Sequence, residues 1–126
     1  MPSINIIARK LVSTDPSLSF VDWLILLWLY SNPSESGKRS LISLQKALKR
    51  VPDFQKPDGD PVFGESQFEQ LILSSLKKLK GRGFAKIFST EERYITIELT
   101  AEGTNFLGNN LSVSDKNFLR EYGMLK

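Results

Sequence analysis

The 126-residue sequence contains neither histidine nor cysteine. Their absence excludes a Ser-His-Asp triad, a thiolate nucleophile, a zinc site built from Cys and His, and a disulfide. Carboxylates, lysines, hydroxyls and tyrosines remain as candidate catalytic groups, which is a narrow basis for catalysis. We therefore expect a protein that is not an enzyme and that uses neither a cofactor nor a metal.

Long hydrophobic runs are also scarce. The stretch from Phe20 to Tyr30 is apolar except for Asp22, but it is far shorter than the roughly 20 residues that span a membrane. A buried core helix is the better interpretation. The N-terminal residues lack the basic start and small-residue cleavage site of a signal peptide. We therefore expect a cytoplasmic protein that does not associate with membranes.

Positive charge is modest in total and uneven along the chain. The net charge is +3, yet residues 38–56 carry six bases against Asp53 alone, and residues 77–86 carry five bases and no acid. Clustered bases can attract the phosphates of a nucleic acid. A solvated helical face explains such clusters equally well, so charge alone leaves both interpretations open.

The hydrophobic periodicity changes once along the chain, from helical to alternating. Residues 1–14 contain an apolar stretch from Ile4 to Val12, broken by Arg9-Lys10, whose period does not distinguish a strand from a short helix. Residues 52–64 are rich in Pro and Gly and predict a long loop, in which Pro57-Asp58-Gly59-Asp60 is typical of a turn rather than of a calcium site. Residues 108–110 predict a break, and Ser114 a short final helix. The main predicted elements are helices near 20–30, 41–51, 65–80 and 101–107 and antiparallel strands near 84–88 and 94–99.

These elements predict an α+β domain over residues 15–107, preceded by an N-terminal arm (1–14) and followed by a helical extension (108–126). The inward positions of the predicted helices and strands should form its core. The residues expected to be largely buried are Trp23, Leu27, Leu44, Leu48, Leu71, Leu76, Leu79 and Leu99.

One part of the sequence has a more specific character. Residues 76–87 read LKKLKGRGFAKI, and residues 93–103 read RYITIELTAEG. In them Gly83 suits the corner between helix and strand, and Thr100 suits the cap of the next helix. This pattern resembles the recognition helix, wing and Leu-Thr-x-x-Gly helix start of winged-helix repressors of the MarR and PadR type. The resemblance covers about residues 20–107 and implies a winged helix, that is, a three-helix core with an antiparallel β-hairpin wing, followed by C-terminal helices.

The resemblance also implies a transcriptional regulator that reads duplex DNA with helix 65–80 and the wing 84–99. Gln70 is the best candidate to read a base, since its amide can pair bidentately with adenine. Arg93 on the wing would enter a minor groove, and the helical bases would neutralise phosphates. The DNA-contacting residues expected in this way are Lys46, Lys49, Arg50, Ser66, Gln70, Ser74, Lys77, Lys78 and Arg93.

Two further questions stay open at the level of sequence. Acidic residues at the start of helix 65–80 and at the wing tip, together with outward Ile42 and Leu73 and the apolar loop residues Phe54, Val62 and Phe63, favour the alternative of a protein-binding module without DNA binding. The apolar C-terminal segment predicts a homodimer by analogy with the repressors. The alternative is that this segment folds back over the core of its own chain.

Overall fold

The computed structural model describes residues 4–32, 38–89 and 95–124, and only the backbone of Lys38 and of residues 122–124. These residues form six α-helices, one short 3-10 helix and a three-stranded antiparallel sheet, which makes the fold α+β. The elements in chain order are α1 (Ile4–Thr14), α2 (Phe20–Ser31), β1 (Lys38–Ser40), α3 (Leu41–Lys49), η1 (Pro52–Phe54), α4 (Glu65–Gly81), β2 (Ala85–Ser89), β3 (Ile95–Leu99), α5 (Ala101–Asn110) and α6 (Val113–Met124).

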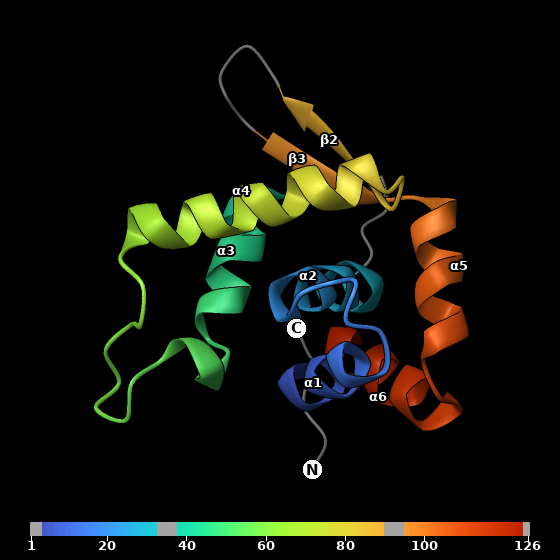
Figure 1. Ribbon diagram of the computed structural model, residues 1–126, viewed down its shortest axis with the longest axis horizontal. Coiled ribbons are helices and arrows are strands. Elements are labelled where there is room, and N and C mark those ends of the chain that lie inside the picture. Colours follow the sequence, from blue (N-terminus) through green and yellow to red (C-terminus); the bar gives the residue numbers. More distant parts are fainter. Residues whose placement is uncertain (1–3, 33–37, 90–94, 125–126) are drawn as a thin grey trace.

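Helix α2 is the centre of the molecule. Figure 1 shows it nearly end-on, with α4 above it, α5 to one side, and α1 and α6 below. Ten of its twelve residues are buried, because apolar side chains cover its whole circumference. A capping box at Ser19 and Asp22 fixes its first turn. Trp23, which follows this capped turn, is fully buried and stacks on Phe106 of α5, with 5.5 Å between ring centres.

The sheet holds the predicted hairpin and one strand that the sequence did not reveal. Strand β3 lies in the middle of the order β1-β3-β2. Ala85 pairs with Leu99 and Ser89 with Ile95, so β2 and β3 run antiparallel in register. The missed strand β1 is only three residues long, too short for an alternating pattern to stand out.

The predicted helices near 20–30, 41–51, 65–80 and 101–107 are confirmed, and residues 1–14 contain a helix rather than a strand. The predicted break at residues 108–110 is wrong, because α5 continues to Asn110. The side-chain amide of Asn110 donates to the Phe106 carbonyl at 2.8 Å, which ties the last turn together. The final helix begins at Val113 rather than Ser114, and the backbone N–H of Asp115 donates to the Ser112 hydroxyl.

Six of the eight residues expected in the core are buried, but Leu71 and Leu99 are only half-buried. The buried stripe of α4 runs through Phe68, Ile72, Leu76 and Leu79. Leu71 precedes Ile72 by one residue and therefore lies at the margin of that stripe. Leu99 is the last residue of β3 and packs against the core while remaining partly exposed.

The corner after α4 has the conformation that its glycine predicts. Gly83 has a φ of +79°, and the N–H groups of Gly83 and Phe84 donate to the carbonyls of Lys80 and Leu79. This is the Schellman end of a helix. Thr100 then ties the corner to α5, since its hydroxyl donates to the Gly83 carbonyl at 2.6 Å and accepts from the Gly103 N–H at 2.9 Å.

The long loop at residues 52–64 is anchored rather than open. It begins with η1, and Gln55 and Pro61 form a β-bridge around a turn at Gly59. Phe54 is buried, and its ring contacts those of Phe20, Phe63 and Phe68. Beside it, the carboxylate of Asp53 accepts hydrogen bonds from Arg9 and Asn5 of α1. Burial raises the pKa of Asp53, but these hydrogen bonds outweigh that effect and hold it below its ordinary value.

Candidate nucleic-acid interface

Helix α4 presents one continuous polar face to solvent. Ser66, Gln70, Ser74 and Lys77 are all exposed, and their spacing of four, four and three residues places them in one row along the helix. The opposite side of α4 is buried on the core through Ile72 and Leu76. The row therefore belongs to a helix whose orientation is fixed by its packing.

A groove runs between this face and strand β2. It has a volume of about 660 Å³, and Figure 1 shows the hairpin rising beside the C-terminal half of α4. Lys77 and Lys80 line it, no acidic residue does, and neither lysine forms an ion pair within the described part of the chain. We call it the α4–β2 groove, and its lining residues are Gln70, Leu73, Ser74, Lys77, Lys80, Ile87 and Ser89.

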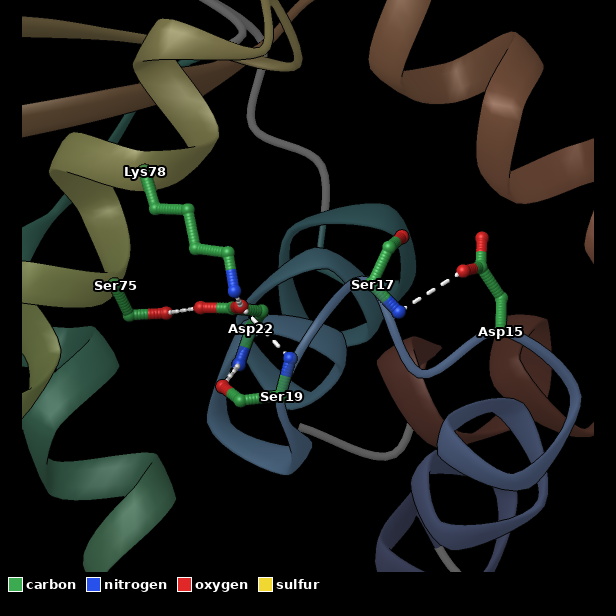
Figure 2. Close-up of polar contacts among 6 residues, drawn as sticks. All are labelled: Asp15, Ser17, Ser19, Asp22, Ser75 and Lys78. Carbon is green, nitrogen blue, oxygen red and sulfur yellow. Dashed lines mark hydrogen bonds and ion pairs between the residues drawn. The ribbon is translucent and has the colours of Figure 1, made fainter.

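Lys78 follows the groove residue Lys77 in sequence, but its side chain points toward Asp22 of α2 instead. Figure 2 shows its ammonium beside Asp22 of α2, at 2.9 Å from a carboxylate oxygen. The side chain of Asp22 is only 2% exposed. Its carboxylate also accepts hydrogen bonds from the Ser75 hydroxyl and from the backbone N–H of Ser19. The positive charge of Lys78 is therefore already paired with a buried carboxylate.

Three donors decide the ionisation of Asp22. Burial alone raises the pKa of a carboxyl group. Here the hydrogen bonds from Ser75, Ser19 and Lys78, with the charge of Lys78, outweigh burial and lower the pKa of Asp22. Its carboxylate is thus stabilised in the charged form and joins α2 to α4. The sequence contained a signal for this contact, because Asp22 alone interrupts an apolar run.

The bases of α3 divide into two groups. Lys49 lies 3.7 Å from Glu65 at the start of α4, in an exposed pair that contributes little stability. Lys46 and Arg50 instead line a separate pocket of about 420 Å³, which shares no residue with the α4–β2 groove. We call it the α3 pocket, and its lining residues are Trp28, Asn32, Arg39, Ser43, Lys46, Ala47 and Arg50.

The structure thus places the residues predicted to contact DNA on several separate surfaces. Gln70, Ser74 and Lys77 share the α4–β2 groove, and Ser66 extends their row. Lys80 of the groove and Arg39 of the α3 pocket were not singled out from sequence, although both belong to the two basic blocks. Arg93 lies outside the described residues, so its predicted contact with a minor groove stays a prediction.

Some of the apolar residues that favoured a protein-binding module are buried against the rest of the chain. Phe54 is buried, Phe63 and Leu73 are half-buried, and Ile42 and Val62 are exposed. A small pocket of about 290 Å³ lies beside the loop, between the rings of Phe54, Phe63 and Phe68 and the Lys49–Glu65 pair.

The C-terminal segment packs on the chain that carries it. Leu107, Leu111 and Leu119 are buried, and Lys10 of α1 pairs with Asp115 of α6 at 2.7 Å. Phe118 is half-buried, and Val113 is 75% exposed. Homodimerisation through this segment stays a prediction, and most of the apolar surface that suggested it contacts the core of the same chain.

Two other kinds of site were sought in the described ranges. No helix among them is both long enough and apolar enough to cross a membrane. Within the same ranges, no three acidic residues gather as they would to hold a metal ion. Comparison with known protein families, with curated proteins and with solved structures found no match to this chain.

Proposed function

We propose that the chain is a winged-helix protein that binds duplex DNA and regulates transcription, with the α4–β2 groove as its DNA interface. The observation that carries the proposal is the composition of this groove, in which two lysines that have no ion-pair partner among the described residues adjoin a row of exposed hydrogen-bonding side chains. The order of elements supports it, because α2, β1, α3, α4 and the β2–β3 hairpin follow one another as three helices and a wing do.

The row on α4 suits the chemistry of a major groove. An α-helix is about 10–12 Å across with its side chains, and the major groove is about 12 Å wide. The Gln70 amide offers a donor and an acceptor to adenine, and Ser66 and Ser74 can pair with any base edge. Lys77 and Lys80 would contact phosphates and set the position of the helix without reading sequence.

The interface proposed here is narrower than the one predicted from sequence. Lys78 is left out because its ammonium is paired with Asp22. Lys49 is left out because it faces Glu65. The wing contact of Arg93 remains part of the proposal on the strength of the resemblance alone.

Fluorescence polarisation with a labelled pool of random duplexes tests the proposal at two salt concentrations. We expect wild-type protein to bind at about 50 mM salt and to weaken steeply at higher salt. Lys77→Ala should weaken binding to all sequences and make the salt slope shallower by about one unit. Gln70→Ala should change the preference at one base position and leave the salt slope almost unchanged.

Lys116→Ala on α6 is the matched control, because it removes the same charge from a helix that does not line the groove. It should bind like wild type. If wild-type protein does not bind at about 50 mM salt and tens of micromolar protein, where even non-specific binding is normally detected, the proposal is wrong. The protein-binding alternative would then lead, with exposed Ile42 and Val62 as the first positions to probe.

A further inference from the structure

We propose that the α3 pocket is a binding site for a phosphate group. It lies where the end of α2, strand β1 and helix α3 meet. The inference does not rest on the proposed function, because this pocket and the α4–β2 groove have no residue in common.

The first argument is charge. Arg39, Lys46 and Arg50 line the pocket, and no acidic residue among those that the structure describes does so. None of the three forms an ion pair within the described ranges of the chain. Ser43, Lys46 and Arg50 are spaced by three and four residues, so α3 and its C-cap Arg50 present them on one face. A concave site with three cations and no acid favours an anion.

The second argument is a shortage of acceptors. Trp28 is 2% exposed, and its indole N–H is buried without an acceptor in the described part of the protein. The Nε–H of Arg39 is in the same state. Of three such side-chain atoms among the described residues, two belong to residues of this one pocket. A buried donor without an acceptor is costly, and a ligand rich in acceptors removes that cost.

The third argument is that one of the charged groups, the guanidinium of Arg39, is held in position. The guanidinium carbon of Arg39 lies 5.0 Å from the centre of the Trp28 ring, a cation–π contact. The side-chain amide of Asn32 donates to the Trp28 carbonyl at 3.0 Å and fixes the end of α2. Part of the ordering that a ligand would otherwise have to impose is thus already present.

Phosphate fits these features better than a smaller anion does. Its oxygens accept several hydrogen bonds at once, and the fork of an arginine matches them bidentately. The pocket volume of about 420 Å³ lies within the usual range for ligand sites. The phosphate has two possible sources, the backbone of a nucleic acid or a small phosphorylated molecule, and the experiment separates them.

The probe is pyrophosphate, titrated into ¹⁵N-labelled protein at constant ionic strength and followed by NMR. The indole N–H signals of Trp28 and Trp23 serve as reporter and internal control. We expect the Trp28 signal to shift in a saturable way and the Trp23 signal to stay in place, since Trp23 lies in the core away from the pocket. Sodium chloride at the same ionic strength should leave both signals unchanged.

Arg50→Gln should weaken pyrophosphate binding roughly tenfold or more, because it removes charge-assisted hydrogen bonds. Arg39→Gln should do the same, and Arg50 is the safer test of the two since its side chain is exposed and not stacked on Trp28. Arg120→Gln, an exposed arginine of α6, is the control and should bind like wild type.

A Trp28 signal that stays in place up to about 10 mM pyrophosphate overturns the proposal, since a site with a Kd of about 1 mM would then be mostly filled. An equal loss of binding in the Arg50→Gln and Arg120→Gln variants would overturn it too. Given binding, duplex DNA distinguishes the sources of the phosphate. Competition between DNA and pyrophosphate indicates a backbone phosphate, and unchanged DNA affinity, or no DNA binding at all, indicates a small phosphorylated ligand.

Discussion

At the scale of single residues, the contact between Asp22 and Lys78 shows that a basic residue of α4 can serve the fold rather than a binding surface. Two neighbouring lysines, Lys77 and Lys78, are both exposed on α4. Only Lys78 reaches the buried carboxylate of Asp22, whose remaining donors are Ser75 and the Ser19 backbone. The charge of Lys78 is therefore paired with a buried carboxylate, although the residue itself is exposed.

Replacing Lys78 with methionine should lower the free energy of unfolding by about 1–3 kcal/mol, because it leaves a buried carboxylate with fewer partners. The matched variant Lys77→Met should change stability by no more than about 0.5 kcal/mol. Urea denaturation at neutral pH measures both. Equal effects of the two substitutions would mean that the Asp22 pair contributes nothing specific.

The same pair should make stability depend on acid pH. The pKa of Asp22 is lowered in the folded protein, whereas an unfolded aspartate titrates near about 3.9. Its contribution to stability is therefore present above that value and is lost as the pH falls through the lower folded value. We expect the stability difference between wild type and Lys78→Met to shrink as urea denaturation is repeated below about pH 3.9. A difference that stays constant as the pH is lowered well below about 3.9 would contradict this assignment.

At the scale of elements, the helix start after β3 depends on a close approach that only glycine allows. A Cβ atom added to Gly103 would lie 2.3 Å from the carbonyl oxygen of Phe84 and 2.9 Å from the side chain of Leu99. The glycine of the Leu-Thr-x-x-Gly pattern therefore serves the contact between α5 and the helix-to-strand corner. The sequence predicted the Thr100 cap, but the close approach became apparent only in the assembled structure.

Gly103→Ala should thus destabilise the protein by about 1–3 kcal/mol through overpacking. Helix propensity alone predicts the opposite sign, a gain of about 0.5–1 kcal/mol. Gly108→Ala is the control on the same helix, since a Cβ added there meets no atom within 4 Å. Thermal or urea unfolding of the two variants decides the matter, and a stabilised Gly103→Ala would contradict the packing described here.

The buried stripe of α4 offers a second test at this scale. Leu76 of α4 is fully buried in the core. Leu76→Ala should lower the free energy of unfolding by about 2–5 kcal/mol, because it removes apolar contacts and leaves a cavity. Leu71→Ala should cost less, since Leu71 lies at the margin of the stripe and is half-buried. A loss below about 1 kcal/mol at Leu76 would show that the helix packs differently.

Local signals explain why most of the fold was predictable from the sequence. Helix α2 and the β2–β3 hairpin follow from hydrophobic period, caps and turn residues, which act over a few neighbours. Strand β1 is short and is defined by pairing with distant β3, through partners such as Arg39 and Ile97. The packing of the Phe54 ring against α2 and α4 is likewise a contact between segments that are distant in sequence. Periodicity carries no information about such contacts.

The candidate site was predictable to a smaller extent for the same reason. The row Ser66, Gln70 and Ser74 follows from helical spacing, and the structure leaves it exposed. The partner of each lysine does not follow from spacing, because Lys78 meets Asp22 and Lys49 meets Glu65 only when α2, α3 and α4 come together. Tertiary contacts thus decided which bases remain unpaired.

At the scale of the whole molecule, the account depends on one surface. Helix α4 is held on α2 by the core and by the Asp22 contact, and the hairpin stands beside its outer face (Figure 1). A helix held in this way, with an exposed polar row and a flanking strand, can contact a duplex without a change in its backbone conformation. The chain's own core covers most of the apolar C-terminal segment, so DNA binding by a monomer is compatible with this arrangement.

The most direct test is to map a short DNA duplex onto the protein by the backbone amide shifts of ¹⁵N-labelled wild-type chain. The account predicts that the largest shifts fall on the outer face of α4, at Gln70, Ser74 and Lys77, and on Ile87 and Ser89 of β2. They should diminish as salt is raised. Shifts confined to other surfaces, such as the pocket beside Phe54 and Phe63, or no shifts at low salt, would contradict it.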